Sequence, residues 1–293
     1  MLSMLYGVYS MSAMPDTQRQ ILITGASSGI GRAAAIELAG RGHRVFASAR
    51  RLPALEELAE AHPGIAAVPL DVTDDASVGA AARIVDELTA GHGLDVLVNN
   101  AGYALGGPIE ALSGEAVEHQ FQTNVFGLLR VTRAFLPAMR ARRSGCVINL
   151  SSVIGRVAFP GMGVYGATKF AVESLSDTLR MELAGFNVFV SLIEPGFVTT
   201  DIGIASAQQA AAFPVTIDGY EELASAAGTW VAKQISENAI SAEQVGRRIA
   251  DAATARRPRA RYLLPASSKV LVGAMNALPD GAADRAKRRV LGL

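Results

Sequence analysis

The sequence lacks the residues that would build a disulfide framework or a metal centre. There is one cysteine, Cys146, so no internal disulfide can form, and a reducing, cytoplasmic location is expected. Its place in the apolar run 146–150 favours a buried strand residue over a nucleophile. The four histidines are scattered without metal-ligand spacing, so we expect no structural metal.

Charge and long apolar runs are also scarce. Charged residues make up 18% of the 293 residues and the formal net charge is zero, so no overall field attracts nucleic acid and no such partner is expected. Because no apolar run reaches about 18 residues, we expect no transmembrane helix. Residues 1–19 make a poor signal peptide, since no basic segment precedes their apolar patch, and we interpret them as a disordered leader.

What the chain does contain is a regular alternation of short apolar runs and helical patterns, in a composition that is half hydrophobic. Asp74 and the capping-box pattern 241–244 are each expected to start a helix. Such alternation requires parallel strands joined by right-handed crossovers. We therefore predict an α/β fold over residues 20–265, a doubly wound Rossmann-type parallel sheet of about seven strands, in the order 3-2-1-4-5-6-7, with helices on both faces. The expected strands are 20–24, 44–48, 65–70, 94–98, 145–150, 187–193 and 261–264.

A glycine-rich turn follows the first expected strand and precedes a helix from Arg32 to about Arg41. Glycines allow a tight turn and the close approach of a pyrophosphate, which would bind the amides at the helix N-terminus. We therefore expect a dinucleotide at this turn. The residues expected to contact it are Gly25, Ser27, Ser28, Gly29, Ile30 and Gly31.

The end of the second expected strand carries arginine where an acidic residue would select NAD. The tip reads Ala49-Arg50-Arg51, with no carboxylate to bind the ribose hydroxyls. A guanidinium pairs well with a 2′-phosphate, so Arg50 favours NADP over NAD. The alternative is that Arg50 and Arg51 only flank the solvated start of a helix before Pro53.

Tyr165 and Lys169 are spaced to lie on one face of a helix, one turn apart. An ammonium beside a phenol favours the phenolate, so we expect the pKa of Tyr165 to fall below its usual value of about 10. Ser152, at the end of an expected strand, would hold a substrate oxygen against the phenol. Spacing alone also allows a surface pair without chemistry.

These motifs together resemble the short-chain dehydrogenase/reductase family in its compact one-domain form, over roughly residues 20–200. The resemblance rests on the turn 24–31, on Asn-Asn-Ala-Gly at 99–102, and on Ser152 thirteen residues before Tyr165. It implies hydride transfer between a nicotinamide and a carbonyl or alcohol. In that reaction Tyr165 is the acid/base, Lys169 assists it and holds the ribose, and Ser152 orients the substrate. Asn124, which the resemblance places fourth in this catalytic set, would anchor a water that links Lys169 to solvent.

The resemblance also implies further contacts to the cofactor, and in one place the sequence departs from the pattern. Some NADP enzymes of the family carry a basic residue in the glycine turn where this chain has Ser28. The implied contacts beyond the turn are Arg50, Asp71, Val72, Asn99, Ala101, Gly102, Tyr165, Lys169, Pro195, Gly196, Val198 and Thr200.

Residues 201–240 are interpreted as two helical pieces without a strand, forming a lid over the substrate. Their apolar side chains favour a lipophilic substrate such as a steroid, retinoid, fatty or aromatic carbonyl. Their small number of charges points the same way. The family resemblance implies a homodimer or homotetramer assembled through the helices near 123–142 and 165–183.

Residues 266–293 combine the apolar run 270–278 with a basic cluster at 285–289. We expect a helix packed on the domain with a solvated charged end; contact with an anionic membrane surface is the alternative.

Two other functions of the protein stay open. One is a cofactor-sensing binding or regulatory protein with the same fold. The other is a sugar-nucleotide epimerase or dehydratase, against which the spacing of the glycine turn and the position of Asn124 speak.

Overall fold

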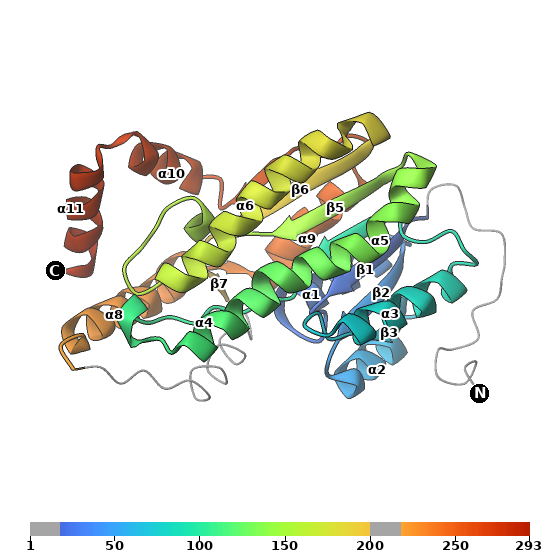
Figure 1. Ribbon diagram of the computed structural model, residues 1–293, viewed down its shortest axis with the longest axis horizontal. Helices are drawn as coiled ribbons and strands as arrows, with labels where there is room; N and C mark the ends of the chain where they lie inside the picture. The colour runs from blue at the N-terminus through green and yellow to red at the C-terminus, as the bar shows by residue number, and fades with distance from the viewer. Residues whose placement is uncertain (1–17, 200–217) are drawn as a thin grey trace.

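The computed structural model describes residues 18–199 and 218–293 (Figure 1). The expected leader lies almost wholly outside the described residues. So do Thr200 and the first part of the expected lid, residues 201–217.

The core is a parallel sheet of seven strands in the order β3-β2-β1-β4-β5-β6-β9, which confirms the predicted Rossmann-type fold and its strand order. Every neighbouring pair is parallel, as buried sheets joined by helical crossovers require. The strands are β1 (Gln20–Thr24), β2 (Arg44–Ala49), β3 (Ile65–Pro69), β4 (Val96–Asn99), β5 (Gly145–Leu150), β6 (Val188–Pro195) and β9 (Arg261–Leu264).

Helices cover both faces of this sheet and bury two separate apolar clusters. One face is covered by α1 (Gly29–Gly40), α2 (Leu52–Ala61) and α9 (Ala242–Thr254). The other is covered by α3 (Asp75–Leu88), α5 (Leu128–Arg142) and α6 (Gly163–Leu183). Strands buried on both faces explain why their sequences are apolar runs rather than alternating patterns.

Two of the helix starts follow the caps expected from the sequence. Asp74 accepts a hydrogen bond from the backbone N–H of Ala76 at 2.9 Å and begins α3. Ser241 and Gln244 form the expected capping box at the start of α9. Further on in α9, a Cβ on Gly246 would lie 2.9 Å from the backbone nitrogen of Ala34, so glycine is what lets α9 lie against α1.

The described part of the expected lid differs from the prediction of helices without a strand. Residues 218–240 contain one helix, α8 (Glu221–Asn238), and then enter a strand, β8 (Ile240–Ser241). β8 pairs with β7 (Val198–Thr199) in a small second sheet. A two-residue strand leaves no periodic signal, because its existence depends on a partner about forty residues away in the chain.

The C-terminal residues form two helices, whereas the sequence suggested one helix on the sheet. They are α10 (Ser268–Ala277) and α11 (Asp280–Leu291), separated at Leu278-Pro279. Proline cannot continue a helix from the preceding turn, which accounts for the break. α10 contacts β9, while α11 contacts α8, so the three helices gather at one end of the molecule (Figure 1).

Candidate active site

The glycine turn joins β1 to α1 at the carboxyl edge of the sheet. Gly25 and Gly29 have φ of +68° and +55°, a region that glycine adopts at little cost. A Cβ on Gly31 would lie 2.5 Å from both Gly25 O and Asn100 Nδ2. The turn therefore has the small, tightly folded backbone that a pyrophosphate site requires.

Asn100 shapes this turn, a role that sequence reasoning did not assign to it. Its Nδ2 donates to Thr24 O at 2.8 Å and to Gly25 O at 3.1 Å. The backbone N–H groups of Asn100 and Ala101 donate to Thr24 Oγ1 at 3.0 and 2.9 Å. The strand end at 99–102 and the glycine turn are thus fixed to one another.

Two arginines follow β2, and the side chain that hydrogen-bonds to the turn is that of Arg51, which was not among the predicted cofactor contacts. Arg51 Nη2 donates to Ser27 Oγ at 3.1 Å and to Ser28 Oγ at 3.3 Å. Arg50 is exposed, and its charge lowers the pKa of Tyr103, which burial raises to about 12. The edge of the turn is therefore cationic and rich in hydroxyl groups.

The end of β3 carries two of the predicted cofactor contacts. Asp71 Oδ1 accepts hydrogen bonds from Thr73 N at 2.9 Å and Thr73 Oγ1 at 2.7 Å. Val72 is buried, and a Cβ on Gly127 would lie 2.8 Å from Val72 Cγ2. These contacts hold both residues in the turn that leads into α3.

Asn99 directs its side chain into the protein. Its Nδ2 donates to Thr132 Oγ1 and to Asn149 Oδ1, both at 2.9 Å, and the residue is buried. This amide joins β4 to β5 and α5. Asn99 was predicted to contact the cofactor, and its side chain stabilises the sheet.

Ser152 and Tyr165 meet beyond the end of β5. The Ser152 hydroxyl donates to Pro195 O at 3.2 Å and accepts from Ile154 N at 3.2 Å. A hydrogen bond with Ser152 also lowers the pKa of Tyr165, which places the serine hydroxyl beside the phenol. The two residues predicted to act on one substrate oxygen therefore lie together.

Lys169 lies behind the phenol and is buried, with a relative exposure of 7%. Its Nζ donates to Leu150 O at 2.7 Å and lies 5.7 Å from the centroid of the Tyr165 ring. A Cβ on Gly102 would lie 3.9 Å from this nitrogen. Burial lowers the pKa of Lys169 to about 8, because the apolar surroundings disfavour the charged form.

The expectation that the pKa of Tyr165 falls below its usual value is wrong for this arrangement. Burial raises the pKa of Tyr165 to about 12, and the Ser152 hydrogen bond opposes the rise only in part. The ammonium lies over the ring at a distance, while burial disfavours the phenolate directly. At neutral pH the tyrosine is a protonated phenol.

Asn124 is the fourth predicted catalytic residue, and it joins the site through a π-helical turn, Gln122–Gly127. This turn lies between α4 (Gly114–Phe121) and α5. Asn124 Nδ2 donates to Thr168 Oγ1 at 3.1 Å, next to Lys169 on α6. π-turns are frequent at functional sites, but no simple sequence pattern marks them, and this one was not predicted.

The loop after β6 contains the remaining predicted contacts. Gly196 N donates to Leu264 O at 2.7 Å, and Val198 lies in β7. Pro195 offers its carbonyl to Ser152, as described above. Thr200 lies outside the described residues.

An aromatic cluster lies beside this loop and was not predicted as a unit. Trp230 of α8 stacks on Phe159, with ring centroids 4.2 Å apart, and meets the edge of Phe197 at 5.3 Å. Tyr220 Oη donates to Glu110 Oε2 at 2.8 Å, which fixes the start of α8 to the 3₁₀ turn Ile109–Ala111. The described half of the lid is thus anchored by apolar rings near the loops that carry Ser152 and Pro195.

The sequence matches the family described as short chain dehydrogenase over residues 19–211, which is well over half of the chain. The chain belongs to the short-chain dehydrogenase family. As a short-chain dehydrogenase/reductase it acts on CH–OH or carbonyl groups.

Three relatives of this short-chain dehydrogenase illustrate the range of the family. An uncharacterized oxidoreductase, YusZ, of Bacillus subtilis is 39% identical over 69% of this chain and 72% of its own length. Retinol dehydrogenase 8 of Bos taurus is 41% identical over 64% of this chain, and that match spans 62% of the bovine protein. The NADPH-dependent 3-dehydrocapnine reductase of Ornithobacterium rhinotracheale is 32% identical over 91% of this chain and 95% of its own length.

Solved structures of short-chain dehydrogenases show the same architecture. One from Streptomyces avermitilis has 31% identity and a TM-score of 0.79, covering 94% of this chain and 96% of the other. One from Burkholderia phymatum in complex with NAD has 28% identity and a TM-score of 0.78, covering 90% and 95%. A serine dehydrogenase complexed with NADP⁺ has 31% identity and a TM-score of 0.71, covering 84% and 94%.

Within residues 18–199 and 218–293, no helix is both long enough and apolar enough to cross a membrane. In the same described residues, no three His, Cys, Asp or Glu side chains gather as they would around a metal ion.

Proposed function

We propose that this protein is an NADP(H)-dependent oxidoreductase that transfers a hydride between the nicotinamide and a lipophilic carbonyl or alcohol. The observation that carries the proposal is the convergence of Ser152, Tyr165 and Lys169 beside a glycine turn flanked by two arginines. The turn fits a dinucleotide, and the two hydroxyls together with the buried ammonium fit proton transfer.

The preference for NADP is supported by charge at the turn. A 2′-phosphate near Ser27 and Ser28 would find the Arg51 guanidinium already placed against both hydroxyls, with Arg50 next to it in the chain. Charge-assisted bonds to phosphate are among the stronger hydrogen bonds in proteins. One relative, which this chain matches over 91% of its length, is named as NADPH-dependent, which supports the same choice.

A bound nicotinamide would supply or accept the hydride, and the residues of the chain would manage the proton. With its pKa raised to about 12, Tyr165 holds a proton at neutral pH that it can give to a substrate oxygen during reduction. Ser152 would turn its donated hydrogen bond from Pro195 O to that oxygen and stabilise the developing charge. Lys169 would place positive charge behind the phenol.

Asn124 would hold the segments that form this site at fixed positions. Its amide binds Tyr103 on one side and Thr168 on the other, so it holds the 102–103 loop and α6 at a fixed separation around Lys169. The water that the family resemblance places between Asn124 and Lys169 stays a prediction.

The lipophilic substrate is supported by an aromatic cluster in which Phe159 and Phe197, from the loops that follow Ser152 and Pro195, pack against Trp230 of α8. Such rings bury substrate through the hydrophobic effect rather than by ionic contacts. A relative with 41% identity is named for retinol, a molecule that is mostly hydrocarbon.

The proposal is tested by measuring NADPH oxidation and NADP⁺ reduction across a panel of lipophilic ketones, aldehydes and alcohols, with NADH and NAD⁺ in parallel. We expect turnover of at least one carbonyl with NADPH. Binding of NADPH without turnover of any panel member would instead support a cofactor-sensing protein, and equal use of NADH would refute the cofactor preference.

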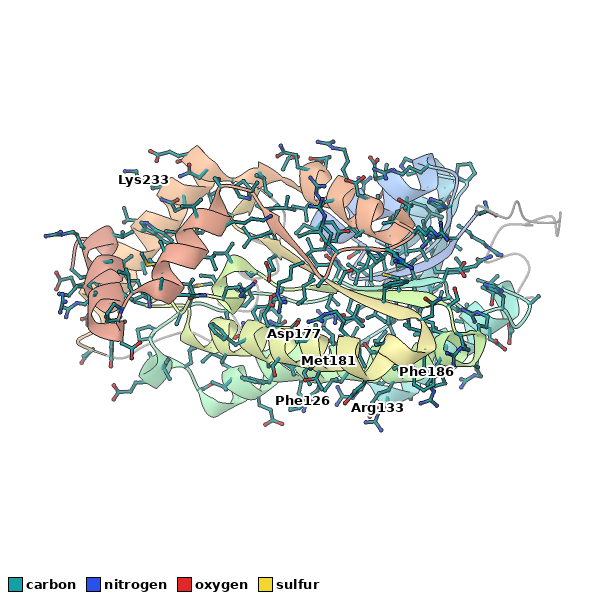
Figure 2. The ribbon with its side chains drawn as sticks, turned by 90° about the horizontal axis from the view of Figure 1, so that it is seen from above. Phe126, Arg133, Asp177, Met181, Phe186 and Lys233 are labelled. Atoms are coloured by element: carbon teal, nitrogen blue, oxygen red, sulfur yellow. The ribbon has the colours of Figure 1, made fainter. Side chains whose placement is uncertain are left out.

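We also propose a homo-oligomer assembled through the outer faces of α5 and α6, and a cytoplasmic location, which the single buried thiol supports. Figure 2 shows Phe126, Met181 and Phe186 on this side of the molecule. Phe126, Phe170 and Met181 are 45%, 44% and 66% exposed, which is unusual for such large apolar side chains.

A further inference from the structure

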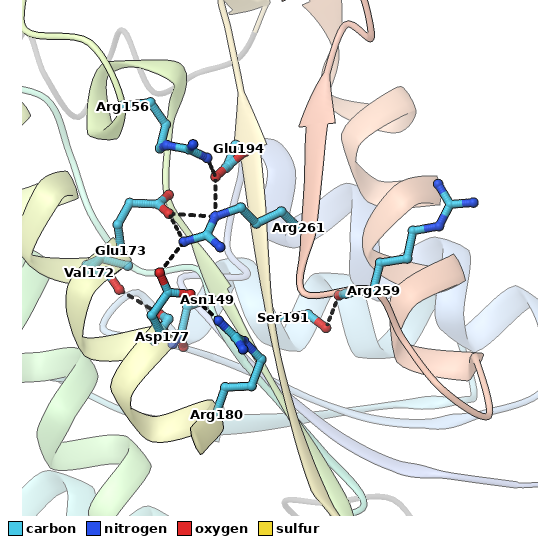
Figure 3. A network of polar contacts seen from close by, with 11 residues as sticks. Asn149, Arg156, Val172, Glu173, Asp177, Arg180, Ser191, Glu194, Arg259 and Arg261 are labelled. Carbon is cyan, nitrogen blue, oxygen red and sulfur yellow. Dashed lines mark hydrogen bonds and ion pairs between the residues drawn. The ribbon is translucent and has the colours of Figure 1, made fainter. Parts of the chain in front are cut away.

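Figure 3 shows a network of charged side chains that meet around Arg261. It brings together one side of the catalytic helix α6, the end of β6, the turn after Ser152 and the last strand β9. Its members are Arg156, Glu173, Asp177, Arg180, Glu194 and Arg261.

Arg261 of β9 is the centre of this network. Its guanidinium donates to Glu173 Oε2 at 3.2 Å through Nε and at 3.0 Å through Nη2. It also donates to Glu194 Oε1 at 3.1 Å and to Asp177 Oδ2 at 2.6 Å. Glu173 and Glu194 are 6% and 1% exposed, so Arg261 is the shared counter-ion of two buried carboxylates.

Glu173 connects the network to the catalytic lysine. It follows Lys169 by one turn on α6, and both side chains are buried. The charge of Glu173 raises the pKa of Lys169, against the burial that lowers it to about 8. The positive charge of Lys169 therefore depends on the Glu173 carboxylate, which lies one turn further along α6.

Opposing interactions act on the pKa of Glu173. Burial raises its pKa above the usual range and the nearby charge of Glu194 adds to the rise, while Ser151 and Arg261 lower it. Ser151 Oγ and Glu173 Oε1 are buried, and neither makes a hydrogen bond of ordinary geometry among the described residues. Without Arg261 the carboxyl would take up a proton, because a buried carboxylate beside a second one is costly to keep charged.

The same network reaches the catalytic serine. Glu194 immediately precedes Pro195, whose carbonyl accepts the Ser152 hydrogen bond. Arg156, in the turn that follows Ser152, donates to Glu194 Oε1 at 3.0 Å. Both sides of the Ser152 loop are thus tied to the carboxylate that Arg261 binds.

We propose that Glu173 and Arg261 are positioning residues of the active site: the carboxylate keeps Lys169 an ammonium, and the guanidinium keeps that carboxylate charged. Their effect on catalysis rests on the role given to Lys169 in the proposed function. The groups that face Glu173 come from its own helix (Lys169, Asp177) and from three packed elements (Ser151, Glu194, Arg261).

The chain offers a direct measurement, because it contains only four lysines: Lys169, Lys233, Lys269 and Lys287. Protein labelled with ¹³C-lysine is titrated by NMR, and the Lys169 signal is assigned by its loss in Lys169→Met. In Glu173→Gln, which keeps the shape and removes the charge, we expect the Lys169 pKa to fall by about one unit. Arg261→Met should lower it in the same direction.

Asp177→Asn is the matched control, since Asp177 also binds Arg261 on the same helix but lies two turns from Lys169. In Asp177→Asn the pKa of Lys169 should equal that of the wild type. A Lys169 pKa that is unchanged in Glu173→Gln, or lowered equally in Asp177→Asn, overturns the proposal.

Circular dichroism checks that each variant is folded; if Arg261→Met is not, Arg261→Gln, which also removes the positive charge and adds no lysine, replaces it, with the same fall expected and an unchanged value counting against the role of Arg261. The titration needs neither cofactor nor substrate, so its failure and a failure of the NADPH assays are separate results.

Discussion

Asn124 and Tyr103 bind each other through both halves of one amide. The Tyr103 N–H donates to Asn124 Oδ1 at 3.1 Å, and Asn124 Nδ2 donates to Tyr103 O at 2.9 Å. The same Nδ2 donates to Thr168 Oγ1 at 3.1 Å, so a residue from a π-helical turn holds a loop and α6 together. The backbone around Lys169 is fixed by a side chain that is itself 2% exposed.

Asn124→Asp tests this arrangement, because it replaces a donor by an oxygen of the same shape. Tyr103 O and Thr168 Oγ1 would then face an acceptor, and an unmade buried hydrogen bond costs about 1–3 kcal/mol. We expect urea denaturation to show a loss of that order. Asn238→Asp, at an exposed amide at the end of α8, should cost less than about 0.5 kcal/mol. Equal stability of the two variants would contradict the structural role of Asn124.

Tyr165→Phe removes the proton donor and leaves the ring in place. General acid catalysis contributes roughly 10²–10⁴-fold, so we expect kcat for carbonyl reduction to fall by that factor. Affinity for NADPH, followed by its fluorescence, should change little. A variant that binds NADPH and keeps most of its activity would show that Tyr165 is not the acid.

The rate of reduction should decline on the alkaline side as Lys169 loses its proton. With its pKa lowered to about 8, Lys169 is charged below that pH and neutral above it. Tyr165, with a pKa of about 12, stays protonated over the same range and does not produce the decline. Initial rates of NADPH-dependent reduction between pH 5 and 10 should therefore fall as pH rises through about 8. A rate that instead rises across this region would exclude the assignment.

Arg51→Asp and Arg50→Asp test the cofactor preference. Each removes a cation from the edge of the turn and adds an anion where a 2′-phosphate would lie. Since a hydrogen bond to a charged group is worth about 1.5–3 kcal/mol, the ratio of NADPH to NADH affinity should fall at least about tenfold.

Fluorescence titrations with NADPH and NADH give this ratio of affinities. Arg248→Asp on α9 serves as a control, in which the ratio should equal that of the wild type. An unchanged ratio in both turn variants would mean that the arginines flank a solvated helix start and nothing more.

Met181→Asp tests assembly through α5 and α6. A charge at an apolar interface position is costly to bury, so the variant should run as a smaller species than the wild type in size-exclusion chromatography with light scattering. Val270→Asp, on the 77% exposed Val270 of α10, should keep the wild-type mass. The interface is misplaced if Met181→Asp keeps that mass while Val270→Asp loses it.

The elements that sequence reasoning located are those with a local cause. Each is determined by residues close together in the chain. They are the apolar runs of the seven strands, the glycines of the first turn and the helix caps at Asp74 and Ser241. Tyr165 and Lys169 could be paired for the same reason, because helical spacing fixes their face.

What the sequence could not indicate depends on partners distant in the chain. The contact from Arg51 to Ser27 joins the segments that follow two neighbouring strands, β2 and β1. The contact from Arg261 to Glu173 joins residues 88 positions apart. The pKa of Tyr165 was expected to fall and instead rises, since the charge of a neighbour can be guessed from spacing but the depth of burial cannot.

The position of Arg261 on the last strand of the sheet has a consequence for how the protein is made. Synthesis proceeds from the N-terminus, so the glycine turn, Ser152 and Lys169 all leave the ribosome before Arg261 does. A nascent or prematurely ended chain that stops before β9 has Glu173 and Glu194 without their common counter-ion, and a sheet whose β6 edge is open. Translation must therefore pass β9 before the Lys169 ammonium has its full set of charged neighbours, and we expect products that stop earlier to have a lower Lys169 pKa even with Ser152, Tyr165 and Lys169 all present.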